Sequence, residues 1–272
     1  MFIGSLSLTF HIMSKLVLLA GFIGLAFFSS CNKSEVYPTS PLSDYNLQTP
    51  GKYIIYELDS LQFPNFGTEQ ATLMYYAKDL VDTSVVIDNL GRPAHPIFHF
   101  ISMQSATGPW QQNNTFLNVP LGNTVEFIEN NLRYIKLHEP IANGYTWKGN
   151  IYIDTYDQTT AIPDITDWDL TYLAGWDYTY QDVNQPLTLG SITLDSTITV
   201  TEQNESTGPI TGNPEDQTSY SQISYGIEKY AKGIGLVYRN FLYHQYQPGP
   251  PPTYTGGYSI GYGITQTMLD HN

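Results

Sequence analysis

The sequence contains one cysteine, Cys31, in 272 residues. A single cysteine leaves no partner for an internal disulfide and no set of thiolates for a cysteine-based zinc site. A domain without disulfides has to be held by its hydrophobic core, and a chain of this length is long enough to form one. The length also fits one large domain, because β-rich chains of this size are often single domains.

Basic residues are scarce as well: 11 Lys and Arg stand against 25 Asp and Glu, for a formal net charge of −14. Such a surface repels nucleic acid and anionic lipid headgroups, so neither is an expected partner. Charged residues make up only 13% of the chain, which excludes a disordered acidic protein. Aromatic residues are abundant instead, 22 of them Tyr, and this composition favours β-strands.

A third absence is a hydrophobic run long enough to span a membrane, which needs about 20 residues. The most apolar run, residues 16–28, is shorter; it follows Lys15 and ends at Ser29, Ser30 and Cys31. A basic start, a short apolar core and small residues before a cut describe a secretory signal peptide. We therefore expect residues 1–30 to be a signal peptide, with Met13 as the start of translation.

The end of this segment, Phe28-Ser29-Ser30-Cys31, resembles the lipobox of bacterial lipoproteins. The resemblance implies cleavage before Cys31 and a diacylglycerol on its thiol, which anchors the protein in a membrane and leaves no thiol for catalysis. Residues 31–44 then form the lipidated cysteine and a Pro-containing tether, and residues 45–272 form a single β domain. An extended tether covers about 3 Å per residue, so it would hold the domain roughly 40 Å from the membrane.

Alternating and β-branched segments, separated by turn signals, recur through the domain. No segment has the apolar stripe of an amphipathic helix. We expect strands or hairpins at residues 52–58, 71–87, 97–103, 124–138, 150–156, 172–180, 193–202, 223–230, 236–246 and 258–269, and loops at residues 107–114, 157–169 and 203–217. Ten to twelve strands with short connections predict an all-β fold with one large antiparallel sheet. The pattern leaves a half-barrel, a barrel and a sandwich-like meander open.

The most regular hairpin lies in the last quarter of the chain. Ile223, Tyr225 and Ile227 alternate with polar residues or Gly, which suits a half-buried strand. In the turn that follows, Gly233 is expected at positive φ, where a β-branched residue fits poorly. Proline is expected to be tolerated at Lys232 if the backbone N–H of that residue has no partner.

Three segments together resemble uncharacterised all-β lipoproteins of the Bacteroidota. They are the opening GKYIIYELDS at residues 51–60, the turn GYTWKGN at residues 144–150 and the hairpin YAKGIGLVYR at residues 230–239. The resemblance implies an outer-membrane lipoprotein with a β-rich domain in the periplasm or on the cell surface. It implies no activity, because the shared segments are turns and strands.

One motif suggests catalysis. Residues 257–261, GYSIG, match the G-x-S-x-G elbow of serine hydrolases, and Asp270 and His271 follow in serine-hydrolase order. The elbow needs a strand before the serine and a helix after it. Here the apolar alternation runs straight through Ser259 as one strand, so we interpret the match as accidental.

We expect no metal and no cofactor. His95 and His99 lie about 13 Å apart on a strand, too far for one metal ion, and are interpreted as sheet-surface histidines. Asp164, Asp167 and Asp169 belong to an acidic stretch that offers calcium an alternative site, but the EF-hand spacing is missing. A solvated acidic loop is the preferred interpretation.

All four tryptophans lie in or beside expected loops. Loop aromatics on a rigid β scaffold often form flat platforms for sugar rings, which favours a binding face made by Trp110, Trp147, Trp168 and Trp176. The alternative is that these side chains close the ends of the core, since large aromatics are usually mostly buried.

These observations favour a non-enzymatic, lipid-anchored protein of the cell envelope whose β domain binds a ligand or partner, with a glycan as one candidate. The alternative is an envelope structural or assembly factor without a small-molecule site. A third hypothesis is a hydrolase whose acid pair comes from distant residues such as Glu126 or Glu129, because the spacing of glycosidase carboxylates cannot be recognised in a sequence. Exposed, converging tryptophans would favour the first hypothesis, and buried ones the second.

Overall fold

The computed structural model describes residues 40–153, 170–173, 175–208 and 218–272. They belong to one compact unit, Thr39–Asn272. Strands dominate this unit, as the composition predicts, and the described helices are single turns. In this part of the chain, no helix is long and apolar enough to cross a membrane.

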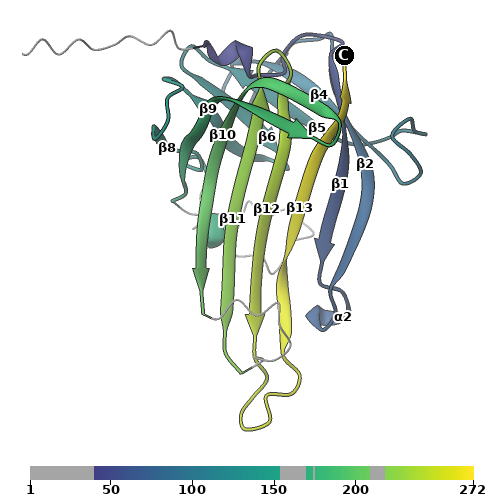
Figure 1. The fold of residues 1–272 in the computed structure, drawn as a ribbon, viewed down its shortest axis with the longest axis vertical. Helices are drawn as coiled ribbons and strands as arrows, with labels where there is room; N and C mark the ends of the chain where they lie inside the picture. The colour runs from purple at the N-terminus through teal and green to yellow at the C-terminus, as the bar shows by residue number, and fades with distance from the viewer. Residues whose placement is uncertain (1–39, 154–169, 174, 209–217) are drawn as a thin grey trace, which may run out of the picture. The chain divides into compact units, whose positions relative to one another are not determined.

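The elements follow one another along the chain as a succession of strands with short connections (Figure 1). They are η1 (Leu42–Asp44), β1 (Tyr53–Gln62), α2 (Pro64–Gly67), β2 (Ala71–Val81), β3 (Val86–Ile87), β4 (Pro93–Ser102), β5 (Gln111–Pro120), β6 (Thr124–Glu129), β7 (Leu132–His138), β8 (Thr146–Lys148), η3 (Leu170–Leu173), β9 (Asp177–Leu189), β10 (Ile192–Thr207), β11 (Ser221–Ala231), β12 (Gly235–Gln247) and β13 (Tyr258–His271).

The strands form one antiparallel sheet in the order β7-β6-β5-β4-β2-β1-β13-β12-β11-β10-β9-β8, with β3 paired to β4 alone. Most neighbours in the sheet are also neighbours in the chain. The exception is β1, which pairs with β2 on one side and with the last strand, β13, on the other. Figure 1 shows β10 to β13 as long, curved strands that run side by side, with the C-terminus next to β1.

The sheet curls until its two edge strands, β7 and β8, lie close together. The Ile135 N–H on β7 donates to the Gly149 carbonyl beyond β8 at 2.8 Å, and the Trp147 indole N–H donates to the Ile135 carbonyl at 2.7 Å. The Tyr180 hydroxyl also binds both the N–H and the carbonyl of His138, each at 2.9 Å. The predicted all-β antiparallel fold is therefore confirmed, and the sheet is a nearly closed barrel.

Two predicted hairpins owe their turns to positive-φ residues. Asn130 and Asn131 join β6 to β7 with φ of 52° and 63°, as a two-residue type I′ turn requires. Gly233 joins β11 to β12 with φ of 78°, as expected. The N–H of Lys232, however, donates to the Ser196 carbonyl at 3.0 Å, so the condition for a tolerated proline at position 232 is not met.

Several expected boundaries are wrong. Residues 150–153 are a turn rather than a strand, and residues 172–180 contain the end of η3 before β9 starts at Asp177. The polar residues 111–114, expected as a loop, begin β5, and residues 203–207 continue β10. Both segments are polar because they lie toward the exposed ends of long strands, where no apolar alternation is needed.

Residues just before the expected domain start already pack on it. Leu42 is buried in the same hydrophobic cluster as Tyr45, and the Asp44 carbonyl accepts a hydrogen bond from the Gly233 N–H at 2.6 Å. Asp44 also forms an ion pair with Lys232, at 3.0 Å. The packed part of the chain therefore begins by Leu42, three residues earlier than the sequence suggested.

The inner face of the barrel is partly polar. On β11 the expected alternation is present, but the buried positions are those of Ser224, Gly226, Glu228 and Tyr230. Gly226 leaves room for Trp176, whose ring lies 3.2 Å from where a Cβ would be. The glycine therefore accommodates an aromatic ring, while the glutamate brings a charge into the interior.

Candidate ligand-binding site

A cavity of about 330 Å³ lies against the inner face of the sheet. Strands from both halves of the barrel supply its walls. The lining side chains are Leu58, Ser60, Tyr75, Asp79, His99, Ile101, Asn113, Asn114, Phe116, Phe127, Glu129, Asn130, Leu236, Arg239, Ile264 and Gln266. Asn113 and Asn130 are exposed, whereas Asp79, His99 and Gln266 are buried, so the cavity has an open polar rim and a polar floor.

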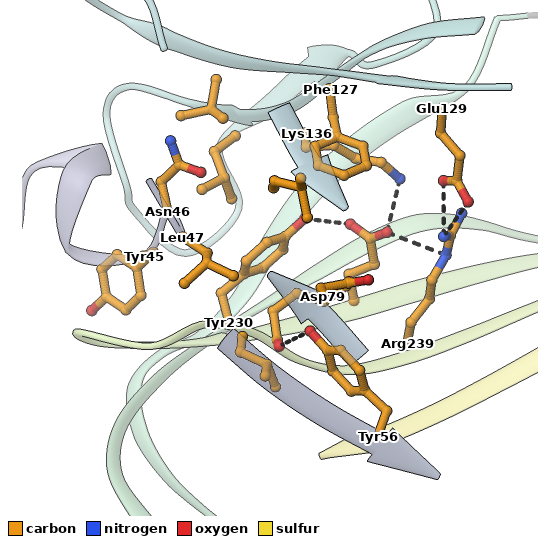
Figure 2. Close-up of a pocket in the computed structure, with 16 residues that line it drawn as sticks. Tyr45, Asn46, Leu47, Tyr56, Asp79, Phe127, Glu129, Lys136, Tyr230 and Arg239 are labelled. Atoms are coloured by element: carbon orange, nitrogen blue, oxygen red, sulfur yellow. Dashed lines mark hydrogen bonds and ion pairs between the residues drawn. The ribbon is translucent and has the colours of Figure 1, made fainter. Parts of the chain in front are cut away.

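A second cavity, of about 60 Å³, shares the walls made by Asp79, Phe127, Glu129 and Arg239 (Figure 2). Residues 45–47, which follow η1, also line this smaller space. The Tyr45 hydroxyl holds this segment in place by donating to the Asn184 side chain at 3.0 Å. The segment next to the expected tether therefore forms part of the cavity wall.

Arg239, on β12, is the cation between the two cavities. Its Nη1 atom donates to both carboxylate oxygens of Glu129, at 3.0 and 3.3 Å, and its Nε lies 3.4 Å from the Glu228 carboxylate (Figure 2). Burial opposes the charge, but Glu129 and Glu228 outweigh it and raise the pKa of Arg239 well above its usual value. Arg239 is therefore a fixed positive charge in the interior.

Lys136, on β7, joins the opposite side of the barrel to the same network. Its ammonium donates to Glu202 at 2.6 Å and to Glu228 at 2.8 Å, and all three side chains are buried. Burial and the Glu228 charge raise the pKa of Glu202. Burial acts on Glu228 as well, but Lys136 and Arg239 outweigh it and lower the pKa of Glu228.

A buried histidine–carboxylate pair forms another part of the floor. His99 Nδ1 lies 2.6 Å from an Asp79 carboxylate oxygen across the β2–β4 pairing. Burial lowers the pKa of His99, but the Asp79 charge outweighs it and the net shift is upward. The expectation of a surface histidine is wrong for His99, because only 8% of the residue is exposed. The pairing with Asp79 is what permits its burial.

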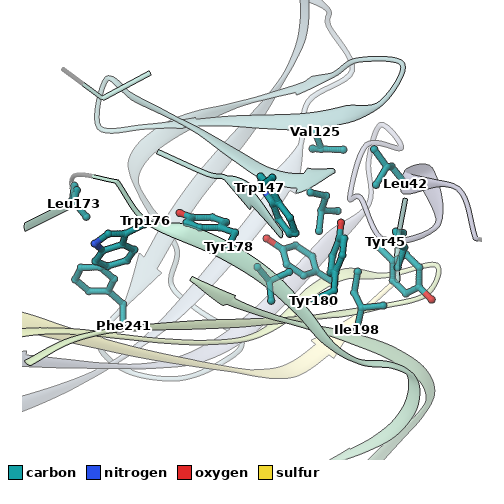
Figure 3. Packing of buried hydrophobic residues seen from close by; sticks show 14 residues of the cluster. Leu42, Tyr45, Val125, Trp147, Leu173, Trp176, Tyr178, Tyr180, Ile198 and Phe241 are labelled. Atoms are coloured by element: carbon teal, nitrogen blue, oxygen red, sulfur yellow. The ribbon is translucent and has the colours of Figure 1, made fainter. Parts of the chain in front are cut away.

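Two tryptophans of the expected binding face are core residues (Figure 3). Trp147 is 7% exposed and packs against the Tyr180 ring at 4.6 Å, and Trp176 is 2% exposed and packs against Phe241 at 5.9 Å. Both indole N–H groups donate to backbone carbonyls, those of Ile135 and Tyr172. A binding face that includes these two residues is therefore wrong, because burial of the large rings closes the core.

The other two tryptophans, Trp110 and Trp168, provide no binding face among the described residues. Trp110 is half-buried beside Gly108 and does not line the cavity. Trp168 lies outside the described residues, as do Asp164, Asp167 and Asp169 of the calcium alternative. Within the described ranges, no group of three or more histidine, cysteine or acidic side chains could hold a metal ion.

The two glutamates named in the hydrolase hypothesis, Glu126 and Glu129, have different ionic partners. Glu126 pairs with Arg92 at 2.5 Å and with Arg133 at 2.7 Å, and these cations outweigh burial and lower its pKa. Glu129 pairs instead with Arg239, so the two glutamates share no partner among the described residues. Residues three apart on a strand point to opposite faces, which explains the separation.

Ser259 lies within β13, as the alternation predicts, and not at a strand-to-helix elbow. Its hydroxyl lies 3.0 Å from His244 Nε2 on the neighbouring strand. Asp270 accepts a hydrogen bond from Tyr53 at 3.4 Å. Neither Asp270 nor His271 belongs to a triad with Ser259 in this arrangement.

Comparison with known proteins supplies no family: no protein-family description matches the chain, and no curated protein is similar to it. The site therefore has to be interpreted from its own chemistry. That chemistry is an open cavity with three carboxamides at its rim, aromatic rings in its walls, and paired charges on its floor. Pockets of roughly 300–1,000 Å³ with a few placed polar groups are typical of small-molecule sites.

Proposed function

We propose that the protein is a lipid-anchored, non-enzymatic binding protein of the cell envelope, and that its cavity holds a small polar ligand such as a glycan fragment. The observation that supports this proposal is the 330 Å³ cavity with Asn113, Asn114 and Asn130 at its rim and Phe116 and Phe127 in its walls. Aromatic rings pack on the apolar faces of a sugar, and carboxamides both donate to and accept from its hydroxyls.

A second candidate is an envelope structural or assembly factor. Burial of Trp147 and Trp176 favours this function, because the tryptophans then serve the core and not a ligand. The cavity favours the binding function, because an accessible space of this size with a few placed polar groups is typical of small-molecule sites.

The role of the cavity in glycan binding is tested by filling it with a larger side chain. Ser60 on β1 lines the cavity, and we expect Ser60→Trp to abolish retention on an array of oligosaccharides and polysaccharides. Thr72 is exposed on β2 and pairs with Leu61, whose side chain points to the face opposite Ser60, so Thr72→Trp is the matched control. Equal retention of the two variants, or no retention of the wild-type protein on any glycan, would contradict the proposed ligand.

The anchor rests on the Phe28-Ser29-Ser30-Cys31 motif. We expect Cys31→Ala to abolish labelling by a radioactive fatty acid in cells and to leave the precursor uncleaved. Cys31→Ser is the closest replacement and should behave in the same way, because the thiol itself receives the lipid. Normal labelling of either variant would exclude Cys31 as the lipidated residue.

A further inference from the structure

The floor of the cavity presents three polar side chains from three strands. His99 comes from β4, Arg239 from β12 and Gln266 from β13, and Arg239 and Gln266 are direct cross-strand partners. His99 is 8% exposed and Gln266 6%, so both are buried except for what they show to the cavity. Side chains buried in this way normally have all their polar atoms bonded.

Part of each side chain is nevertheless left without a protein partner. Among the described residues, His99 bonds through Nδ1 alone, Arg239 donates through Nη1 alone, and the Gln266 carboxamide makes no hydrogen bond. Among the described residues, the fully buried side-chain atoms that make no hydrogen bond are Asn46 Nδ2, His95 Nδ1, Asn118 Oδ1 and Arg239 Nε. His99 Nε2, Arg239 Nη2 and the Gln266 amide are not among them, so these atoms keep accessible surface, and all three residues line the cavity.

The accessible atoms of these three side chains are mainly donors. Arg239 Nη2 carries two N–H groups, and a protonated imidazole whose Nδ1–H is bonded to Asp79 offers Nε2–H as a second, charged donor. The Gln266 amide adds a neutral donor. Arg239 is paired with Glu129 and His99 with Asp79, so both cations are stabilised in their charged forms without a ligand. Donors fixed in this manner suit an anionic oxygen pair better than a hydroxyl.

We infer that the ligand carries a carboxylate, as a uronic acid residue of a glycan does, and that this carboxylate binds between Arg239 Nη2, His99 Nε2 and the Gln266 amide. The inference rests on the proposed function and specifies the ligand of the same cavity. The sugar ring then lies toward the rim, where Asn113, Asn114 and Asn130 bind its hydroxyls.

Binding is expected to weaken with rising pH. The charged groups that face His99 are Asp79 from β2, Glu129 from β6 and Arg239 from β12. Asp79 outweighs burial and raises the pKa of His99 above its ordinary value of 6.5. As the pH passes this raised pKa, Nε2 loses its proton and presents a lone pair to the carboxylate, which removes one donor and adds repulsion.

The test compares sugars that differ only in the carboxylate. We expect isothermal titration calorimetry of the mature lipidated protein in detergent to show D-galacturonate or D-glucuronate binding at least tenfold more tightly than D-galactose or D-glucose at pH 6. The preference should fall at least threefold between pH 6 and pH 8.5. His99→Gln should remove this pH dependence, whereas His95→Gln, on the same strand but outside the cavity, should keep it.

Arg239→Lys keeps the charge beside Glu129 but lacks Nη2, and it should abolish the preference for uronates. If this variant does not fold, the carboxylate inference is still tested by the pH dependence of uronate binding in the wild-type protein and in His99→Gln. Equal binding of uronates and neutral sugars would overturn the inference that the ligand carries a carboxylate, but it would agree with the proposed glycan site. Binding of none of the four sugars would overturn the carboxylate inference, and the glycan array with Ser60→Trp would then judge the proposed function separately.

Discussion

At the residue scale, the left-handed backbone of Gly233 shows how one position defines a hairpin. A Cβ at this glycine would meet no atom within 4 Å, so only backbone strain opposes a larger residue. We expect Gly233→Val to lower the free energy of unfolding by about 1–3 kcal/mol, measured by urea denaturation. Gly122 has equal space but no positive φ, so Gly122→Val is the control. Equal losses in the two variants would exclude strain as the cause.

Lys232, beside it, shows why a turn position can reject proline. Its N–H donates to the Ser196 carbonyl and its ammonium pairs with Asp44. Proline removes both interactions, so the substitution is expected to be destabilising. The sequence alone could not reveal this, because Ser196 lies on β10 and the bond joins the β11–β12 turn to that neighbouring strand.

Trp147 is the residue whose function the structure changes most. Its ring packs among Tyr145, Tyr178 and Tyr180, and its indole N–H closes the contact between β7 and β8. We expect Trp147→Ala to cost about 3–5 kcal/mol in urea denaturation, through the cavity left behind. Trp110→Ala, at a half-buried position, should cost clearly less. A Trp147→Ala protein of unchanged stability would return this residue to the candidate binding residues.

At the scale of elements, Lys136 links β7 to β10 and β11 through buried ion pairs with Glu202 and Glu228. Its loss leaves Glu202 and Glu228 buried beside each other. We expect Lys136→Met to lower the free energy of unfolding by about 3–5 kcal/mol, because removal of one partner leaves uncompensated buried charge. The measurement is chemical denaturation at neutral pH.

The exposed pair of Lys148 and Asp177, whose side chains are 54% and 60% exposed, provides the matched control. Lys148→Met should change stability by at most about 1 kcal/mol, since solvent screens a surface ion pair. Adding Glu202→Gln to Lys136→Met should recover part of the loss, because one of the two carboxylates is then neutral. A double variant no more stable than Lys136→Met would contradict a charge-based cost.

The elements that the sequence predicts well are those with local causes. The hairpins at Asn130-Asn131 and at Gly233 depend on neighbouring residues, and the alternation along β11 identifies a strand. The polar start of β5 was missed because it lies near the open end of the barrel. The alternation does not reveal which face of β11 points inward, because Glu228 is polar yet faces the interior. Its burial depends on the ion pairs with Lys136 and Arg239, which come from other strands.

The candidate site was missed for the same reason. Asp79 has no motif around it, and neither the histidine pair that includes His99 nor the hairpin segment that ends at Arg239 indicates a binding site. Their meeting depends on the pairing of β2 with β4 and on curvature that brings β12 into reach of β6. Sequence could indicate that polar residues alternate on these strands, but not that the polar face lines an interior space.

At the scale of the whole molecule, the barrel carries buried ionic groups whose stabilising effects occupy different pH ranges. Glu126 and Glu228 have lowered pKa values, because their cationic partners outweigh burial, so their contributions are present above the ordinary glutamate pKa and are lost as the pH falls through the lowered values. His99 behaves oppositely. Its pKa is raised in the folded protein, so its contribution is complete below pH 6.5 and is lost as the pH rises through the raised value.

This contrast predicts an alkaline loss of stability that depends on one side chain. We expect the free energy of unfolding of the wild-type protein, from urea denaturation between pH 5.5 and pH 9, to fall relative to that of His99→Gln as the pH rises. Glutamine keeps an N–H donor near Asp79 but does not titrate, so the difference between the two proteins isolates the imidazole. His95→Gln should run parallel to the wild type, because the pairing with Asp79 belongs to His99 alone in the described part of the chain. A constant difference between wild type and His99→Gln across this range would mean that His99 is not charged in the folded barrel, and the donor assigned to its Nε2 would be lost with it.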